Sequence, residues 1–195
     1  GGDEPFLKKL DALFSTKADL GAEASPDISG LIGLYAQGNE PNHHIPYLYA
    51  YAGQPWKTAQ RVRQIVDTFY TDKPNGLCGN EDLGQMSAWY ALSAMGFYPV
   101  NPANGVYVLG SPSVDQAVIS NKGGKPFTLK VMHNNPTNIY IQGATWNGKP
   151  WNNSYITHAM IRQGGTFVLT MGPSPSPTFG VAKENRPPQD LPVKK

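Results

Sequence analysis

The chain has 195 residues, enough for one domain or two small ones with a substantial hydrophobic core. Its 16 basic and 14 acidic side chains nearly balance at +2, and no run of Lys and Arg forms a nucleic-acid-binding patch. Charged residues make up only 15% of the chain, against roughly 25% in average domains. Tyr, Trp, Asn, Gln, Gly and Pro are plentiful instead, which favours a neutral polar ligand such as a sugar.

Two further features of the chain narrow the class of protein. No apolar run approaches the roughly 20 residues of a membrane span, and Cys78, the single cysteine, excludes an internal disulfide. The sequence opens without an initiator Met or a signal peptide. We therefore expect a piece of a longer protein or a processed chain, and export of the parent protein stays open.

Residues 4–98 are expected to be mainly helical. Apolar residues recur at helical spacing from Phe6 to Phe14, with Asp3 as a cap and Pro5 in the first turn. Further helices are expected at 44–51, about 56–71 and about 83–95, after a loop at 15–28 and a short apolar stretch at 28–36. The last helix has little polar face and is expected to be buried on most sides. Short-looped helices of this kind indicate a helical array or toroid.

From about residue 105, apolar residues alternate with a period of two, which predicts strands. The expected strands are 106–109, 117–119, 127–131, 139–141 and 166–170. Asn147-Gly148 predicts a two-residue hairpin turn, and the short strands indicate a curved sheet or an antiparallel β-sandwich. The predicted fold is therefore α+β, with a helical part at 1–104 and a β part at 105–195.

One triplet occurs twice in the helical half. Gly38-Asn39-Glu40 returns as Gly79-Asn80-Glu81, which Asp82 follows at once. Each copy places a glycine, an amide and a carboxylate where a loop enters an expected helix. If the two junctions meet, they form an anionic, oxygen-rich pocket that suits a hard cation, carboxylate catalysis on a polar substrate, or both.

Each of these residues also has an ordinary structural interpretation. Asp82 could be a catalytic carboxylate at the start of the 83–95 helix, or only its N-cap with Glu81 as a first-turn acid. Asn39 and Glu40 could supply oxygens to Ca²⁺, although they match no EF-hand loop, or Asn39 could be a local cap. A zinc site is disfavoured because the adjacent His43 and His44 cannot form the i, i+4 pair of a zinc helix.

The histidines and tryptophans leave similar alternatives. One of His43 and His44 is expected to bind substrate or hold Glu40, and the other to serve in the core or as a cap. Trp56 and Trp89 are expected near the candidate site, where they could stack on sugar rings, while Trp146 and Trp151 lie in the β half. The chain lacks a serine-hydrolase elbow and nucleotide-binding patterns.

The motifs that carry these residues resemble glycoside hydrolase family 92, a family of calcium-dependent, inverting, exo-acting α-mannosidases that is abundant in gut Bacteroidetes. The resemblance runs from about residue 3 to 180. Its long motifs are 38–49, 52–58, 76–90 and 96–99, with shorter ones at 27–30, 110–112 and 140–142.

The resemblance implies that this chain is the C-terminal fragment of a longer enzyme. It would supply the helical end of an incomplete (α/α)6 toroid followed by an antiparallel β-sandwich-like region. An N-terminal β-sandwich domain and the general acid, a glutamate, would lie upstream of Gly1. The parent would be periplasmic or secreted, and it would remove terminal mannose, with α-1,2 linkages as the expected type, from glycans such as N-glycans or yeast mannan. The fragment alone is expected to be inactive.

The resemblance also assigns roles to residues. Asn39, Glu40 and Asp82 correspond to ligands of Ca²⁺, and Asp82 is the expected general base, with Glu81 second. The residues expected to bind substrate are His43, His44, Asn80 and Trp89. Some members of the family carry Asp at the position of Asn80.

Two other functions fit the residues. A non-catalytic carbohydrate-binding module would use Trp146, Trp151 and Tyr140 as a stacking platform. A helical protein-interaction scaffold would give no response to sugars, and it would leave Asn39, Glu40 and Asp82 without a use.

Overall fold

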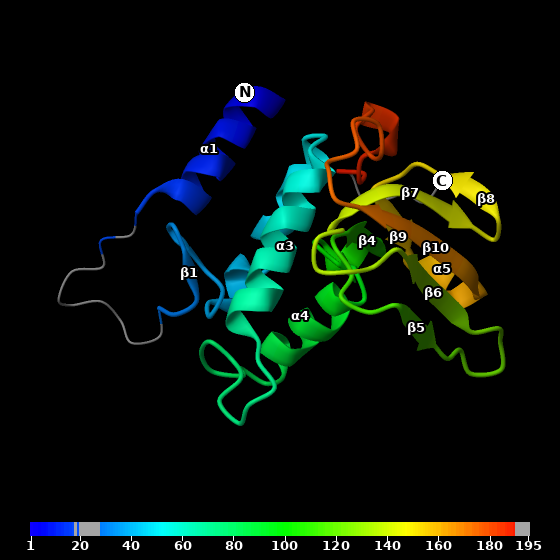
Figure 1. Ribbon diagram of the computed structural model, residues 1–195, viewed down its shortest axis with the longest axis horizontal. Coiled ribbons are helices and arrows are strands. Elements are labelled where there is room, and N and C mark those ends of the chain that lie inside the picture. Colours follow the sequence, from blue (N-terminus) through cyan, green and yellow to red (C-terminus); the bar gives the residue numbers. More distant parts are fainter. Residues whose placement is uncertain (18, 20–27, 190–195) are drawn as a thin grey trace.

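The computed structural model describes residues 1–17, 19 and 28–189, so most of the predicted 15–28 loop and the end of the tail lie outside the described residues. Most helices gather on one side of the molecule and the two larger sheets on the other (Figure 1). The mixture of helix and sheet agrees with the α+β prediction. The helices in the described ranges are α1 (Asp3–Ser15), α2 (Leu48–Tyr51), α3 (Pro55–Phe69), α4 (Gln85–Ala94) and α5 (His158–Gln163).

Helix α1 is present as the sequence predicted, with Pro5 in its first turn. Asp3 is its first helical residue and does not cap it. The buried Phe14 places its ring 5.0 Å from the ring of Tyr35. Tyr35 belongs to the hairpin formed by the 28–36 stretch, whose strands are β1 (Leu31–Ile32) and β2 (Tyr35–Ala36).

Helix α3 lies at the centre of the helical side (Figure 1). Its buried stripe includes Val62, Ile65 and Val66, as the spacing of apolar residues predicted. The predicted helix at 44–51 is only partly α-helical. It consists of a 3-10 turn, η2 (Ile45–Tyr47), followed by the four-residue α2, and a further 3-10 turn, η1 (Glu40–Asn42), precedes it.

Helix α4 differs from the prediction that it is buried on most sides. Met86, Trp89, Ser93 and Ala94 are buried, but Tyr90 on another side is 40% exposed. Ser87, Ala88 and Ala91 are exposed as well. The prediction was wrong because an apolar helix is buried only where other elements cover it, and the described residues cover one side of α4.

The β region contains two sheets. The larger has the strand order β5-β6-β10-β7-β8, and the smaller has the order β3-β4-β9. Their bounds are β3 (Phe97–Tyr98), β4 (Val106–Leu109), β5 (Gln116–Ile119), β6 (Phe127–Met132), β7 (Tyr140–Trp146), β8 (Lys149–Trp151), β9 (Tyr155–Thr157) and β10 (Gly165–Gly172). All five predicted strands are present. The short β3, β8 and β9 and helix α5 were not predicted.

The expectation of a purely antiparallel arrangement was wrong for one pair of strands. β10 runs parallel to β6, with Phe167 opposite Leu129, and antiparallel to β7. A parallel neighbour needs a long crossover, and the chain between β6 and β10 supplies it by way of β7, β8, β9 and α5. The predicted hairpin at Asn147-Gly148 is confirmed, since both residues have positive φ (49° and 80°) and they join β7 to β8.

The β region has its own apolar core, to which both sheets and α5 contribute. Phe127 and Phe167 are fully buried, and their rings lie 6.5 Å apart. Ile156 of the smaller sheet and Met160 of α5 belong to the same cluster. The strands thus position one another around shared aromatic residues, whereas the sandwich arrangement itself remains a prediction.

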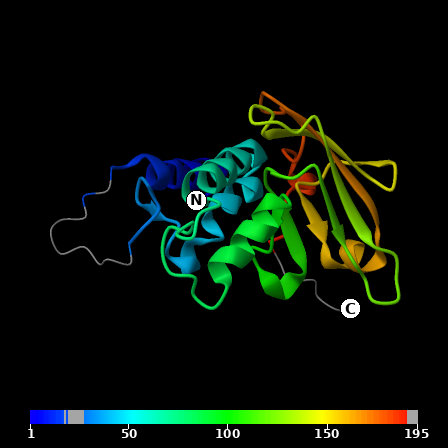
Figure 2. The ribbon, with the colours of Figure 1, turned by 60° about the horizontal axis from the view of Figure 1, so that its bottom comes forward.

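The helical and β regions lie against each other along α3 and β7 (Figure 2). Gln60 on α3 donates a hydrogen bond of 2.7 Å to the hydroxyl of Tyr140 on β7. Arg186 in the C-terminal segment pairs with Asp3 of α1 at 2.6 Å. The division at residue 104 remains a prediction, as does the toroid; β3, before that boundary, pairs with β4 after it. Among the described residues, no helix is long and apolar enough to cross a membrane.

Candidate active site

The two copies of the Gly-Asn-Glu triplet meet at their glycines. A Cβ atom built on Gly79 would lie 3.3 Å from the Cα atom of Gly38, and one built on Gly38 would lie 2.7 Å from the carbonyl oxygen of Cys78. Ser29 joins both loops, because its Oγ donates to the Cys78 carbonyl while its own carbonyl accepts from Gly38 N–H at 3.1 Å. The two Asn-Glu pairs, which are 41 positions apart in sequence, therefore begin side by side in the structure.

The first loop presents its polar groups without capping a helix. Asn39 precedes the 3-10 turn η1 with an extended backbone (φ −107°, ψ 102°) and no side-chain capping hydrogen bond. Its side chain is exposed, and that of Glu40 is half-buried. Neither side chain has a hydrogen-bond partner among the described residues, so their oxygens are available to a ligand.

The second loop has an unusual backbone. Asp82, Leu83 and Gly84 all have positive φ (46°, 58° and 90°), and α4 begins only at Gln85. Two non-glycine residues in the left-handed region cost free energy that the surroundings must supply. The backbone carbonyl of Asp82 accepts a hydrogen bond from Gln85 N–H at 3.2 Å, while its side chain is exposed and does not cap α4.

Glu81 takes the structural role that the sequence left open for Asp82. Its two carboxylate oxygens accept hydrogen bonds from the backbone N–H (3.0 Å) and the hydroxyl (2.8 Å) of Ser87, in the first turn of α4. Within the part of the chain that the structure describes, the carboxylate of Asp82 has no such partner. Asn80, between the loop contact and Glu81, is exposed.

His43 lies inside the helical core. It is 1% exposed, and its Nε2 atom lies 2.9 Å from the carbonyl oxygen of Gln37. Its Nδ1 atom lies 3.0 Å from Nε2 of Gln85, which also lies 3.1 Å from the hydroxyl of Tyr98. Burial lowers the pKa of His43, which keeps its ring neutral. His43 is thus the core histidine of the pair.

Trp89 is part of the same buried group. It is fully buried, and its indole N–H donates to the carbonyl oxygen of His43 at 3.0 Å. The expected contact between Trp89 and a sugar disagrees with this position, because neither face of the ring is open to a ligand. The indole instead fixes the backbone between η1 and η2.

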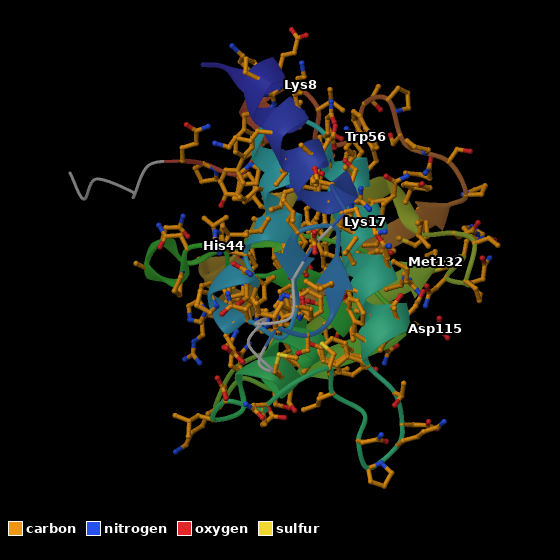
Figure 3. The ribbon with its side chains drawn as sticks, turned by 90° about the vertical axis from the view of Figure 1, so that its left-hand side faces the viewer. Lys8, Lys17, His44, Trp56, Asp115 and Met132 are labelled. Atoms are coloured by element: carbon orange, nitrogen blue, oxygen red, sulfur yellow. The ribbon has the colours of Figure 1, made fainter. Side chains whose placement is uncertain are left out.

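A hollow of about 300 Å³ opens beside these residues, and we call it the Glu40 hollow. Its polar wall consists of Glu40, His43, His44, Gln85 and Tyr98. Its apolar wall consists of Ala88, Leu92 and residues 99, 100 and 102. His44 is half-buried and lies at the edge of the molecule, far from Met132 in the β region (Figure 3). The structure thus places three of the predicted residues, Glu40, His43 and His44, around one cavity.

A second hollow, of about 410 Å³, lies on the other side of α4, where Tyr70, Ser87 and Tyr90 meet the 71–77 turn. Residues 85 and 88 face the Glu40 hollow, and residues 87 and 90 point the opposite way because each residue turns the helix by about 100°. The first turn of α4, with Glu81 and Asp82 before it, therefore separates two open spaces.

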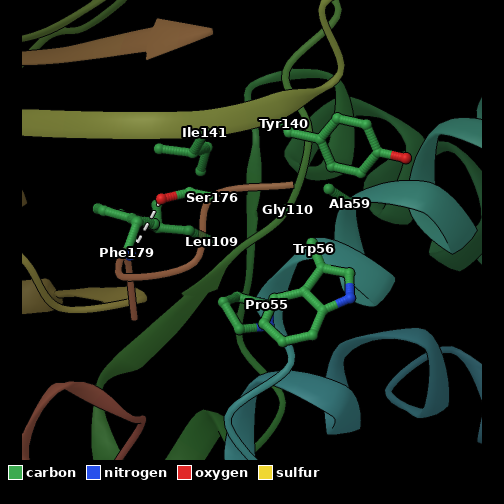
Figure 4. Close-up of a pocket in the computed structure, with 9 residues that line it drawn as sticks. All are labelled: Pro55, Trp56, Ala59, Leu109, Gly110, Tyr140, Ile141, Ser176 and Phe179. Carbon is green, nitrogen blue, oxygen red and sulfur yellow. Dashed lines mark hydrogen bonds between the residues drawn. The ribbon is translucent and has the colours of Figure 1, made fainter. Parts of the chain in front are cut away.

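The predicted position of Trp56 near the site was wrong. Trp56 lies at the contact between α3 and β7, where it lines a water-sized cavity of about 10 Å³ with Tyr140 and Phe179 (Figure 4). In Figure 3 it is well separated from His44. Trp146 and Trp151, which a binding module would use as a platform, are partly buried and pack against the β core.

The donor atoms near the loop contact are oxygens, as Ca²⁺ requires. Within the described ranges, no group of three or more His, Cys, Asp and Glu side chains could hold a metal ion. The chain offers two carboxylates, Glu40 and Asp82, and the amide of Asn39, whereas Ca²⁺ takes roughly 6–8 oxygen ligands. By donor type alone these residues suit part of a calcium site, whose other ligands would be backbone carbonyls, water or groups from elsewhere.

Gln85 and Tyr98 were missed at the sequence level. Both lie in segments that carry the family resemblance, but an amide and a phenol have no chemical pattern of their own. The only available signal was the position of Gln85, four residues before the tryptophan of the buried helix face.

Comparison with known proteins identifies the family to which the chain is similar. Residues 1–173 match the glycosyl hydrolase family 92 catalytic domain. A protein of Arthroderma benhamiae described as an uncharacterized secreted glycosidase is 34% identical over 191 residues, which is 96% of this chain and 22% of that protein.

Two solved structures from Bacteroides thetaiotaomicron are similar over nearly the whole chain. The GH92 α-mannosidase BT3965, in complex with mannoimidazole, has 40% identity and a TM-score of 0.92 over 99% of this chain. The GH92 inverting mannosidase BT2199 has 36% identity and a TM-score of 0.82 over 96% of this chain. The chain spans 26% of each of these proteins. On this evidence, the chain belongs to glycosyl hydrolase family 92, a family of glycoside hydrolases.

Proposed function

We propose that this chain forms part of a calcium-dependent, inverting exo-α-mannosidase, and that the meeting of the two Gly-Asn-Glu loops builds one half of its active site. The observation that carries the proposal is the contact of Gly38 with Gly79, which starts both Asn-Glu pairs from one point. The names of the similar structures, an α-mannosidase and an inverting mannosidase, support the substrate and the stereochemistry.

Asp82 is the proposed general base. A general base needs an ionised carboxylate within reach of the attacking water, and Asp82 is exposed, with a side chain that makes no hydrogen bond to α4 among the described residues. Glu81 is the weaker candidate, because both of its oxygens already accept hydrogen bonds from Ser87. In an inverting enzyme, the acid and the base lie roughly 6.5–9.5 Å apart, with room for water between them. We propose that the acid comes from outside this chain.

Asn39, Glu40 and Asp82 are the proposed calcium ligands. When bound, the ion would supply a fixed positive charge that holds sugar hydroxyl groups and favours a distorted ring. The chain's own contribution is to position these oxygens, since Gly38, Ser29 and Gly79 hold the two loops together. His44, at the Glu40 hollow, and Asn80, on the second loop, are the proposed contacts to the sugar.

The proposed substrate is terminal mannose on glycans such as N-glycans or yeast mannan, with α-1,2 linkages as the preferred type. The proposed location is periplasmic or extracellular, which the description of the Arthroderma relative as secreted supports. We further propose that an N-terminal domain of the same polypeptide completes the site, so that the 195-residue chain alone is inactive.

The test compares the 195-residue chain with the longer protein that contains it. Both are assayed on 4-nitrophenyl α-mannoside and on α-1,2-, α-1,3- and α-1,6-mannobiose, with calcium or with EDTA. We expect turnover by the longer protein only, loss of turnover in EDTA, recovery with calcium, and release of β-mannose by NMR. Turnover by the short chain, or EDTA-resistant activity, would contradict the corresponding part of the proposal.

A further inference from the structure

We infer that Gln85 is a sugar-binding residue, whose side-chain oxygen is directed into the Glu40 hollow as a hydrogen-bond acceptor for a sugar hydroxyl group. The inference rests on the proposed mannosidase function for the identity of the ligand. The direction of the amide rests on hydrogen-bond chemistry alone.

The first step is the tautomer of His43. Its Nε2 atom lies 2.9 Å from the carbonyl oxygen of Gln37, and a carbonyl can only accept a hydrogen bond. Nε2 must therefore carry the proton. The ring cannot easily turn, because it is 1% exposed, and Trp89 fixes the His43 backbone through a 3.0 Å hydrogen bond.

The second step is the orientation of the Gln85 amide. In a neutral ring protonated at Nε2, the Nδ1 atom has only a lone pair, so its partner must be a donor. The group 3.0 Å away is therefore the NH₂ of Gln85 and not its oxygen. The second N–H of this NH₂ group lies within reach of the Tyr98 hydroxyl, at 3.1 Å. An amide whose orientation would otherwise be ambiguous is thus assigned by its neighbours.

The third step is the position of the remaining oxygen. Both donors of Gln85 are used inside the protein, while its Oε1 atom has no partner among the described residues and is not a buried atom. Gln85 lines the same cavity as Glu40 and His44. A cavity with a few fixed polar groups is what orients a polar ligand. Like the carboxylate of Glu40, Oε1 can only accept hydrogen bonds. Both groups therefore select the hydrogen atoms of sugar hydroxyl groups.

His43 is then a positioning residue, which acts through Gln85 and does not touch the sugar. It holds the amide in one of two orientations, and the reversed orientation would present NH₂ to the cavity. The reversed amide would donate to a sugar hydroxyl oxygen in place of accepting from a hydroxyl hydrogen.

The experiment uses the longer, calcium-loaded protein that contains this chain. The variants are Gln85→Leu and, as a matched control, Gln60→Leu, which removes an exposed glutamine that bonds to Tyr140 of β7 and does not line the hollow. Substrates are 4-nitrophenyl α-mannoside and its 2-, 3-, 4- and 6-deoxy analogues. We expect Gln85→Leu to lower kcat/KM on the parent sugar about tenfold, the size of one lost hydrogen bond. On one deoxy analogue the loss should disappear, and Gln60→Leu should match wild type throughout.

An equal loss on all five substrates would overturn the inference, because it would make Gln85 merely structural. A second measurement avoids any folding defect of the variant. In wild-type protein labelled with ¹⁵N-histidine, His43 should carry its proton on Nε2 and not on Nδ1, and the opposite tautomer would also overturn the inference. Wild-type protein that cleaves no α-mannoside would instead refute the proposed function.

Discussion

The β region differs from the loop edge of the helical region, by which we mean residues 38–40 and 79–84, in how far its side chains are buried and paired. In the β region, Phe127, Leu129 and Phe167 are fully buried or nearly so, and the Asn147-Gly148 turn has the backbone that its residues favour. At the loop edge, Asp82 and Leu83 have positive φ although neither is glycine. Leu83 is 108% exposed, as fully as a residue in an unfolded chain.

This difference indicates where function lies. A non-glycine residue in the left-handed region costs roughly 1–3 kcal/mol and persists only where the surroundings determine it. The packed β core contributes stability and leaves few groups free, whereas the loop edge carries strain and unpaired oxygens. Local rules are expected to fail chiefly at functional sites. The loop edge follows this expectation with two such residues in a row, whereas in the β region His133 (φ 59°) and Asn147 of the hairpin turn are single cases.

The largest expected effect concerns Asp82. In the longer enzyme, we expect Asp82→Asn to lower kcat by about 10²–10⁴, the usual contribution of a general base. Because the side chain is exposed and makes no capping hydrogen bond, the melting temperature should stay close to that of wild type. Glu81→Gln is the matched control. It should lower stability by about 0.5–2 kcal/mol by weakening the contact with Ser87, and it should reduce kcat less. The reverse order of activities would assign the base to Glu81.

The β core should show the next largest effect. Phe167→Ala removes a fully buried ring and should cost about 3–5 kcal/mol of unfolding free energy, measured by denaturant titration. Tyr90→Ala, on the bare side of α4, should cost at most about 1 kcal/mol, since its main contact is the ring of Tyr70, 5.0 Å away. Similar losses of unfolding free energy for the two variants would mean that the side of α4 with Tyr90 is buried and not exposed.

A smaller effect is expected where the two loops meet. Gly38→Ala places a methyl group 2.7 Å from the Cys78 carbonyl oxygen, too close for packed atoms. We expect a loss of about 1–3 kcal/mol in stability and weaker calcium binding by isothermal titration calorimetry. Gly143→Ala, on β7, is the control, because no atom lies within 4 Å of its added carbon. Unchanged calcium affinity in Gly38→Ala would show that calcium binding does not depend on the contact between the two loops.

The smallest expected effect is the pH dependence from His43. Burial lowers its pKa below 6.5 in the folded protein, despite the opposing influence of the hydrogen bond to the Gln37 carbonyl and of the Glu40 carboxylate. As pH falls below 6.5, the unfolded chain therefore takes up this proton first, so the unfolding free energy should decrease with falling pH in that range. A ring titration followed by NMR checks the sign, and a His43 pKa at or above 6.5 would contradict it.

The predictions from sequence succeeded where local pattern decides structure. The five predicted strands, the Asn147-Gly148 turn and the inner stripe of α3 from Val62 to Val66 are present. They failed where a residue's role depends on what packs against it. Trp56 and Trp89 look alike in sequence, yet one lies against β7 and the other is fully buried under His43.

Composition, periodicity and the repeated Gly-Asn-Glu triplet by themselves determined the α+β class, the order of most elements and the set of candidate residues that could offer oxygens to a ligand. Those features are local, because helix and strand periods and turn preferences act over a few residues. Only the tertiary structure brought Gly38 to Gly79, buried His43, assigned capping to Glu81 and held the NH₂ group of Gln85 inside the protein. Each of these depends on contacts between segments distant in sequence or on the direction of a hydrogen bond, neither of which a linear pattern contains.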